Sequence, residues 1–227
     1  MTARLRLILF DVDGTLVDSQ NDIVASMSAA FRSVGQTPPA RAAILSIVGL
    51  SLERAVEHLA PDLLPATYEK MVDVYKKTYA DLRRSGGADR SSPLFPGARA
   101  VLDDLASEPM HLLGVATGKS RRGLTFLLDA HGLQDIFITQ QVADHHPSKP
   151  HPSMVLTAMG EMGVSAQDTV VIGDTRFDLE MARAAGARFI GVSWGYHAPA
   201  SMTGADAIVE QFDELPAAIA RVWSDLT

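Results

Sequence analysis

Two aspartates that follow a short apolar run near the N-terminus are the first residues of this chain that suggest chemistry. The stretch LILFDVDGTLVDS places Asp11 and Asp13 directly after the apolar residues 7–10. At about 4 Å and an effective dielectric constant near 20, two carboxylates repel each other by about 4 kcal/mol. A fold that places both at the end of a buried strand therefore needs a positive partner that offsets this cost.

Three later segments carry polar side chains at similar places. Thr117 and Gly118 follow the apolar run LLGVA, and Asp174 follows TVVIG, with Asp178 four residues further on. Lys149 stands alone in the polar stretch HHPSKPHP. In a doubly wound sheet, ligands bind in the crevice at the carboxyl ends of the strands. We therefore expect these loops to meet at one site.

The residue types predict what this site binds. Clustered carboxylates are typical of a magnesium site, because Mg²⁺ prefers oxygen ligands and its charge offsets their repulsion. Lys149 adds a point charge suited to a phosphate group. The Thr117 hydroxyl and the backbone N–H of Gly118, at the entry of a helix capped by Ser120, add donors for phosphate oxygens. A site for Mg²⁺ and a phosphate ester is the prediction.

Alternating strand and helix patterns are needed to bring these loops together. The sequence predicts an α/β fold, a doubly wound and mostly parallel sheet with an inserted all-helical domain. The expected strands are 5–10, 111–117, 136–139, 169–173, 188–193 and 207–209, and the expected helices between them are 98–106, 120–131, 153–162, 177–185 and 215–223.

The insert lies directly after the first strand. Amphipathic patterns predict helices from residue 19 to Gly35, over 52–59 and through 68–82, with no strand between 19 and 90. The segment 86–97 is rich in Gly, Ser and Pro and is typical of a linker. We therefore expect residues 1–18 and 91–227 to form an α/β core domain and residues 19–90 a helical cap domain.

Composition narrows the class of partner. The 227 residues carry a formal net charge of −7, which argues against nucleic acid or an anionic membrane surface as the main partner. The chain has no cysteine, which excludes disulfides and thiolate chemistry and is consistent with a reducing cytoplasm. No apolar run reaches the length of a signal peptide core or a membrane span. We expect a cytoplasmic protein.

The motifs also resemble those of a known family. The segments DVDGT, VATGKS, the isolated KP and GDTRFD occur in the order typical of the haloacid dehalogenase superfamily. The helical insert resembles the cap of its phosphoglycolate phosphatase-like branch. This resemblance covers nearly the whole chain, and four motifs in order are more specific than any one of them.

The resemblance implies a role for each matching residue. Asp11 would be the nucleophile that forms an aspartyl-phosphate, and Asp13 the general acid and base. Mg²⁺ would be held by the Asp11 carboxylate, the Asp13 backbone carbonyl and Asp174. Thr117, Gly118 and Lys149 would hold the phosphate oxygens. From behind these residues, Asp178 would orient Lys149 or the waters on the metal.

The implied activity is a Mg²⁺-dependent hydrolysis of a small phosphomonoester. An acid at position 13 disfavours dehalogenation, because breaking a carbon–halogen bond needs no proton donor there. Phosphoglycolate is the substrate that the resemblance most suggests, and sugar phosphates, nucleotides and pyrophosphate stay open. A phosphomutase of the capped branch and a non-catalytic binding protein are the alternatives.

Several residues have a second interpretation. Asp178 fits the pattern of a helix capping box, because Thr175 lies three residues before it. The histidines His145, His146 and His151 lack the pattern of a metal site and are typical of a surface loop. In the cap, Gly49 and Arg54 of VGLSLER are candidates for substrate contact, and Arg54 is equally typical of a solvated helix residue.

Overall fold

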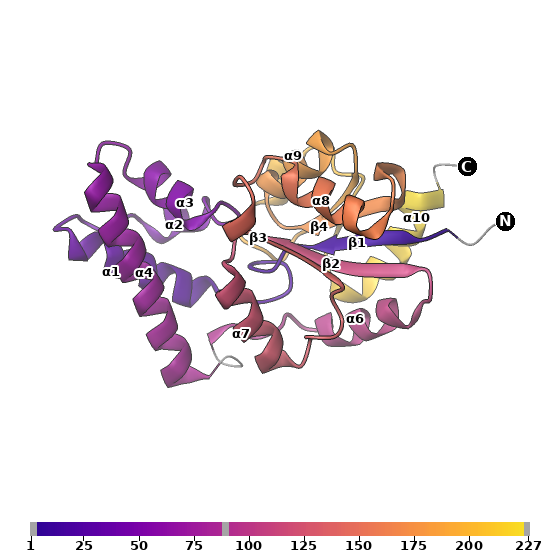
Figure 1. Cartoon of the computed structure of the whole chain (residues 1–227), viewed down its shortest axis with the longest axis horizontal. Helices are drawn as coiled ribbons and strands as arrows, with labels where there is room; N and C mark the ends of the chain where they lie inside the picture. Colours follow the sequence, from indigo (N-terminus) through magenta and orange to yellow (C-terminus); the bar gives the residue numbers. More distant parts are fainter. Residues whose placement is uncertain (1–3, 88–90, 225–227) are drawn as a thin grey trace.

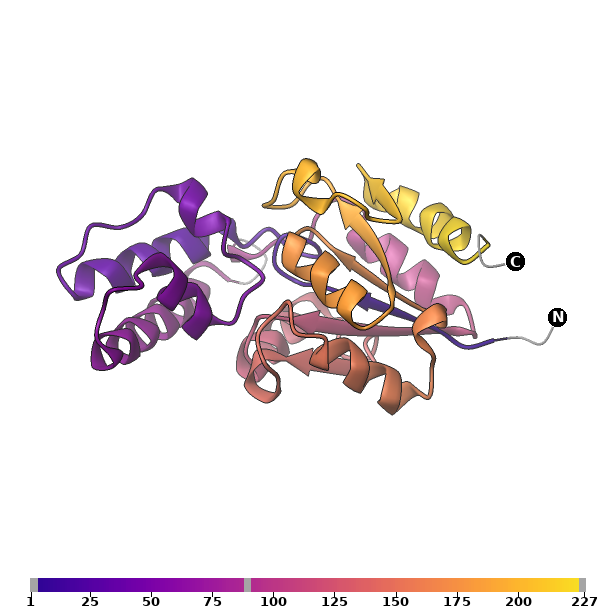
Figure 2. The same cartoon turned by 90° about the horizontal axis from the view of Figure 1, so that it is seen from above.

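The computed structural model describes residues 4–87 and 91–224 of the chain. Figures 1 and 2 show two regions: a sheet covered by helices, and a group of helices beyond one end of that sheet. Residues 88–90, which belong to the predicted linker and adjoin the predicted domain boundary, lie outside the described residues.

The sheet has six parallel strands in the described part of the chain, in the order β3-β2-β1-β4-β5-β6. This confirms the predicted doubly wound α/β fold, with β1 at the centre and crossovers to both sides. The strands are β1 (Arg6–Phe10), β2 (His111–Thr117), β3 (Thr139–Val142), β4 (Thr169–Gly173), β5 (Arg188–Val192) and β6 (Ala207–Val209).

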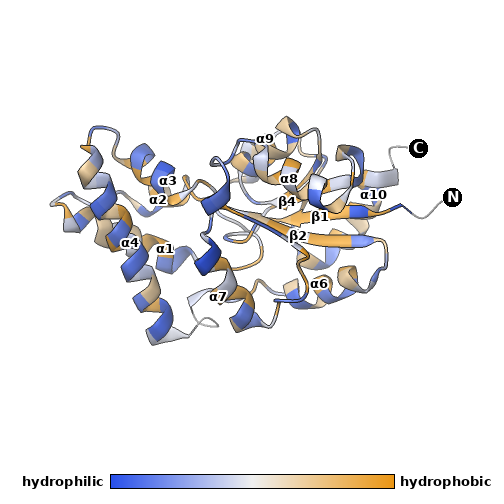
Figure 3. Ribbon diagram, in the orientation of Figure 1, coloured by the Kyte–Doolittle hydropathy of each residue, from blue (hydrophilic) through white to orange (hydrophobic). Residues whose placement is uncertain are grey.

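The central strands are apolar along their length because both faces of the sheet are covered. Ile8 and Phe10 pack into one hydrophobic cluster with α6, α7 and α10, whereas Leu7 and Leu9 pack into another with α8 and α9. In Figure 3 the strands β1 and β2 are almost entirely hydrophobic, and the surrounding helices alternate. These helices are α6 (Ala98–Ser107), α7 (Arg121–His131), α8 (Ser153–Met162), α9 (Arg176–Ala184) and α10 (Leu215–Ser224).

The helices after β1 form a separate hydrophobic cluster, which we call the cap. They are α1 (Gln20–Ser33), α2 (Arg41–Leu45), α3 (Leu52–Leu59) and α4 (Pro65–Gly86). Met27, Ile44, Val56 and Met71 are almost fully buried among them. No strand forms between residues 19 and 87, as predicted, and α2 is an addition because five residues are too few to show a helical period.

The third strand was predicted in the wrong place. Residues 136–139 were expected to form it, but β3 covers Thr139–Val142. Ile136 and Phe137 precede the strand and pack on the core, where Phe137 meets Phe10 edge to face with ring centroids 6.3 Å apart. The strand itself contains Gln141, which is buried and donates hydrogen bonds to Thr139 and Glu161 at 2.7 and 2.8 Å. Hydrogen bonding of this kind allows polar residues in a buried edge strand.

Between residues 4 and 224, apart from the undescribed 88–90, no helix is long and apolar enough to cross a membrane.

Candidate active site

A cavity of about 970 Å³ lies between the cap and the carboxyl ends of β1 and β2. Asp11, Asp13 and residues 117–120 line it from the core, and parts of α1, α3 and α4 line it from the cap. The loops that follow the strands therefore meet, as the sequence predicted, and the cap covers them.

Asp11 occupies the first position after β1. Its backbone N–H donates to the carbonyl oxygen of Ile172 at 2.9 Å, which continues the pairing of β1 with β4 and fixes the side chain. The side chain is 2% exposed, and Nζ of Lys149 lies 2.8 Å from its Oδ1. Burial raises the pKa of Asp11 to about 7 against the opposing charge of Lys149. The carboxylate is thus held in a site that disfavours negative charge unless more positive charge is present.

Asp174 lies beside Asp11 at the end of β4. Its oxygens accept hydrogen bonds from the Thr15 hydroxyl at 3.0 Å and from the backbone N–H of Tyr196 at 2.7 Å. Burial and the nearby charges of Asp11 and Asp178 raise its pKa well above the usual value. Gly14 has a φ of +85°, and a Cβ there would lie 2.3 Å from the Asp174 carboxylate. Glycine is therefore required in DVDGT for the turn and for this close approach.

Three carboxylates form a group that fits a divalent cation. Oxygens of Asp11, Asp174 and Asp178 all lie within 4.8 Å of one another, and all three residues are buried. Oδ2 of Asp11 is buried and accepts no hydrogen bond from any residue that the structure describes. Buried oxygens without a partner are costly, and a cation with oxygen preference removes that cost. Asp11 and Asp174 thus suit the predicted metal site, whereas the side chain of Asp13 is not part of this group.

Lys149 is 1% exposed and not a solvated surface lysine. Its Nζ lies 2.8 Å from Asp11 and donates to Asp178 at 2.6 Å. Burial lowers the pKa of Lys149, but the charges of these two aspartates outweigh burial and raise it. The lysine therefore stays positively charged next to Asp11.

Asp178 has both of the contacts considered from sequence. It forms a capping box at the start of α9, where its Oδ2 accepts from the Thr175 N–H at 3.1 Å and Thr175 accepts from the Asp178 N–H at 3.2 Å. Its other oxygen accepts from Lys149. A Cβ on Gly173 would lie 2.6 Å from Asp178. Helix capping and the orientation of Lys149 thus depend on the same side chain.

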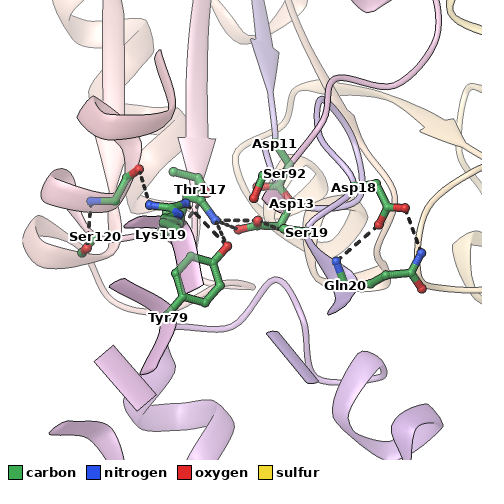
Figure 4. Close-up of polar contacts among 12 residues, drawn as sticks. Asp11, Asp13, Asp18, Ser19, Gln20, Tyr79, Ser92, Thr117, Lys119 and Ser120 are labelled. Carbon is green, nitrogen blue, oxygen red and sulfur yellow. Dashed lines mark hydrogen bonds and ion pairs between the residues drawn. The ribbon is translucent and has the colours of Figure 1, made fainter. Parts of the chain in front are cut away.

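Asp13 points to a different cation. Nζ of Lys119 lies 2.5 and 2.6 Å from its two carboxylate oxygens, and the Ser19 hydroxyl donates to it as well (Figure 4). Burial raises the pKa of Asp13, but the charge and hydrogen bond of Lys119 outweigh burial and hold it below the usual value. Sequence analysis missed Lys119 as a site residue, although it follows the phosphate-binding pair Thr117-Gly118 in VATGKS.

Thr117 and Gly118 lie where β2 ends. Thr117 is 1% exposed, and its hydroxyl accepts from the Lys119 N–H at 3.2 Å. The next helix is capped as predicted, because the Ser120 side chain accepts from the Gly123 N–H. A Cβ on Gly118 would lie 2.6 Å from the carbonyl oxygen of Leu50 in the cap. The backbone of the cap therefore packs directly against this glycine, where a side chain would not fit.

The structure brings one of the two cap candidates to the site. Gly49 lines the cavity with a φ of +103°, and a Cβ there would lie 3.0 Å from the Thr175 hydroxyl. Arg54 is not among the lining residues; its side chain is 68% exposed and pairs with Glu57 at 2.8 Å. The structure therefore does not bring Arg54 to the site, because the inner face of α3 carries Ala55 and Val56 instead.

The loop histidines serve other contacts. His146 bonds Gln141 at 2.8 Å and Ser153 at 2.9 Å, and His151 accepts from the Ser153 N–H at 3.2 Å. No histidine belongs to a potential metal-binding group within the described ranges.

A capped parallel sheet with acidic, basic and hydroxyl side chains at its strand ends defines a class of enzyme. Residues 8–192 match the family model described as haloacid dehalogenase-like hydrolase. The chain belongs to this hydrolase family, which confirms the resemblance seen in the sequence.

Individual relatives cover almost the whole chain. The protein named probable phosphatase IndB of Dickeya dadantii is 36% identical over 213 residues, 92% of this chain and 91% of the relative. A phosphoglycolate phosphatase of Yersinia pestis is 30% identical, with 95% and 93% covered. A beta-phosphoglucomutase structure from Clostridium difficile has a TM-score of 0.84 at 18% identity, covers 98% of both chains, and shows a shared fold.

Proposed function

We propose that this protein hydrolyses a small phosphomonoester with Mg²⁺ through an aspartyl-phosphate on Asp11. The observation that carries the proposal is the state of Asp11, a buried carboxylate with an unpartnered oxygen between Lys149 and Asp174. Because burial disfavours the ionised form of Asp11, a cation bound next to this carboxylate would favour the ionised form that acts as a nucleophile. The names of the relatives, a probable phosphatase and a phosphoglycolate phosphatase, support this class of reaction.

The nucleophile and its surroundings follow from the contacts. Asp11 attacks the phosphorus atom with one carboxylate oxygen, and the bond from phosphorus to the leaving oxygen breaks. Lys149, which stays charged, stabilises the negative charge on the transferred group. Mg²⁺ held by Asp11, Asp174 and the Asp13 backbone would draw charge from the phosphoryl oxygens. Thr117 and Gly118 donate to the remaining oxygens.

Asp13 moves the protons. It gives a proton to the leaving alcohol and later takes one from the water that attacks the aspartyl-phosphate, which restores the Asp11 carboxylate. Lys119 favours the ionised form of Asp13, which suits the second step. A phosphate dianion that enters the cavity attracts Lys119 and repels Asp13, so it raises the pKa of Asp13 in the direction the first step requires.

The test is phosphate release with Mg²⁺ from phosphoglycolate, sugar phosphates, nucleotides, pyrophosphate and an aryl phosphate. Asp11→Asn and an EDTA-treated sample are the controls. Turnover of at least one ester, abolished in both controls, supports the proposal. Isomerisation of a sugar phosphate without phosphate release would favour the mutase, and Mg²⁺ binding without any turnover would favour a binding protein.

A further inference from the structure

Arg83, in the last turn of α4, is a buried cation that the reaction above does not use. It belongs to the cap, lines the cavity, and is 7% exposed. Arginine is rarely buried to this extent without a carboxylate partner, because removing its charge from water is costly.

The contacts of Arg83 leave its charge unbalanced. Nη1 donates to the Gly123 carbonyl oxygen at 3.2 Å, and Nη2 donates to the Tyr79 hydroxyl at 3.5 Å. The guanidinium also lies over the rings of Tyr79 and Phe126, 4.5 and 5.2 Å from their centres. Within residues 4–87 and 91–224, no carboxylate forms an ion pair with it.

The two acidic residues whose charges interact with Arg83, Asp13 and Asp22, form no ion pair with it. Asp13 is paired with Lys119 at 2.5 Å. The charge of Asp22 interacts with Arg83, but no ion pair joins these two side chains. Among the described residues the Arg83 guanidinium therefore has no carboxylate at ion-pair distance.

Tyr79 connects Arg83 to the reacting end of the cavity. Its hydroxyl lies 3.5 Å from Arg83 and accepts from Lys119 at 3.3 Å, while Lys119 touches Asp13 (Figure 4). If Asp13 protonates the leaving oxygen, the rest of the leaving alcohol extends from Asp13 into the part of the cavity that Arg83 lines.

We propose that Arg83 determines specificity by binding a second anionic group, carried by the leaving alcohol. The inference rests on the proposed phosphomonoesterase function and names its substrate class: phosphate esters whose alcohol bears a carboxylate or another phosphate. The planar guanidinium offers paired donors that match the oxygens of such a group. A leaving alcohol without a negative charge leaves the positive charge of Arg83 without an anionic partner.

The experiment compares substrates that differ in this one group. We measure kcat/KM for phosphoglycolate, ethanediol bisphosphate and ethyl phosphate in the wild type, Arg83→Gln, Arg83→Lys and Arg32→Gln. Arg32 is a cap arginine on the exposed side of α1 that does not line the cavity. The first two substrates distinguish a carboxylate from a phosphate as the preferred anion.

The wild type is expected to prefer an anionic ester over ethyl phosphate, and Arg83→Gln to reduce this preference by about tenfold to hundredfold, the range for losing a hydrogen bond to a charged group. Arg83→Lys should retain part of the preference, and Arg32→Gln all of it. Using a ratio within one variant removes the effect of partial unfolding, which thermal melts of each variant monitor.

The inference is overturned if Arg83→Gln turns over ethyl phosphate and keeps the wild-type preference, or if the wild type has no preference. Absence of phosphate release from every ester in the wild type contradicts the proposed function instead, so the two failures are distinguishable. If Arg83→Gln does not fold, Arg83→Lys provides the test. The assignment of Arg83 to the second anion is then refuted if Arg83→Lys prefers the anionic esters over ethyl phosphate as strongly as the wild type does.

Discussion

Chelation of divalent cations should make the burial of Asp11 measurable as a pH-dependent stability. Burial raises the pKa of Asp11 to about 7, whereas an aspartate in an unfolded chain titrates near about 3.9. Between these values the folded protein holds a proton that the unfolded chain has released, so the free energy of unfolding falls as the pH rises. One proton changes it by about 1.4 kcal/mol per pH unit, which gives an upper bound of about 4 kcal/mol over the whole interval.

The assay is urea unfolding in EDTA between about pH 5 and 8, with Asp11→Asn as the matched variant. This variant keeps His146 and His197, whose pKa values burial lowers and whose titration acts in the opposite direction in the acidic half of the range. The difference between the two proteins therefore reports on Asp11 together with the groups on which its charge acts, Asp174 and Lys149. We expect Asp11→Asn to gain stability relative to the wild type as the pH rises.

Saturating Mg²⁺ should reduce this pH dependence in the wild type, because a cation next to Asp11 favours its ionised form. At one hundred times the dissociation constant, it should also add about 2.7 kcal/mol of stability. A difference between wild type and Asp11→Asn that does not vary with pH in EDTA would mean that Asp11 is ionised throughout. The argument from burial would then be wrong.

Three further substitutions test individual contacts. Lys149→Met should lower the free energy of unfolding by about 3–5 kcal/mol, because it leaves buried carboxylates without their cation; circular dichroism in urea measures this, and a loss below about 1 kcal/mol would contradict a buried pair. Lys119→Met should raise the pKa of Asp13 and move the alkaline limb of the kcat/KM profile to higher pH, because Asp13 must be protonated to act as the acid in the first step. An unmoved alkaline limb would contradict this role of Asp13. Gly118→Ala should push Leu50 away and lower kcat/KM by about tenfold or more, since small displacements at a site are costly, while an unchanged value would show that the cap need not approach this closely.

The core of the fold was predictable because its strands are buried on both faces. Short continuous apolar runs such as TVVIG are typical of parallel strands that are buried on both faces. The polar residues that follow these runs mark the strand ends. The third strand was misplaced because Gln141 is buried through a hydrogen bond to Glu161, a side chain distant in sequence. A pattern of hydropathy contains no information about such partners.

The site was predictable where its residues stand at the ends of strands, and not where they depend on contacts with the cap. The proximity of Asp11, Thr117 and Asp174 was predictable because each stands at the end of a strand or directly after it, and the topology alone brings such positions together. Lys119 and Arg83 were missed because their importance depends on contacts of α4 with the loop after β2 and with the first turn of α7. Arg54 was expected on the basis of its charge, but its position on α3 turns it to solvent.

The distribution of charge along the cavity suggests how a substrate is oriented in it. At the core end, three buried carboxylates lie together and Lys149 pairs with two of them, Asp11 and Asp178, so this end is short of positive charge and suits a divalent cation. In the middle, Asp13 and Lys119 neutralise each other. At the cap end, Arg83 lacks an ion-pair partner among the described residues, so this end attracts an anion. If both proposals hold, we expect an ester whose alcohol carries a carboxylate to bind with its phosphorus at Asp11 and its carboxylate at Arg83, because the reverse orientation would place the carboxylate among the aspartates with no phosphoryl group to transfer.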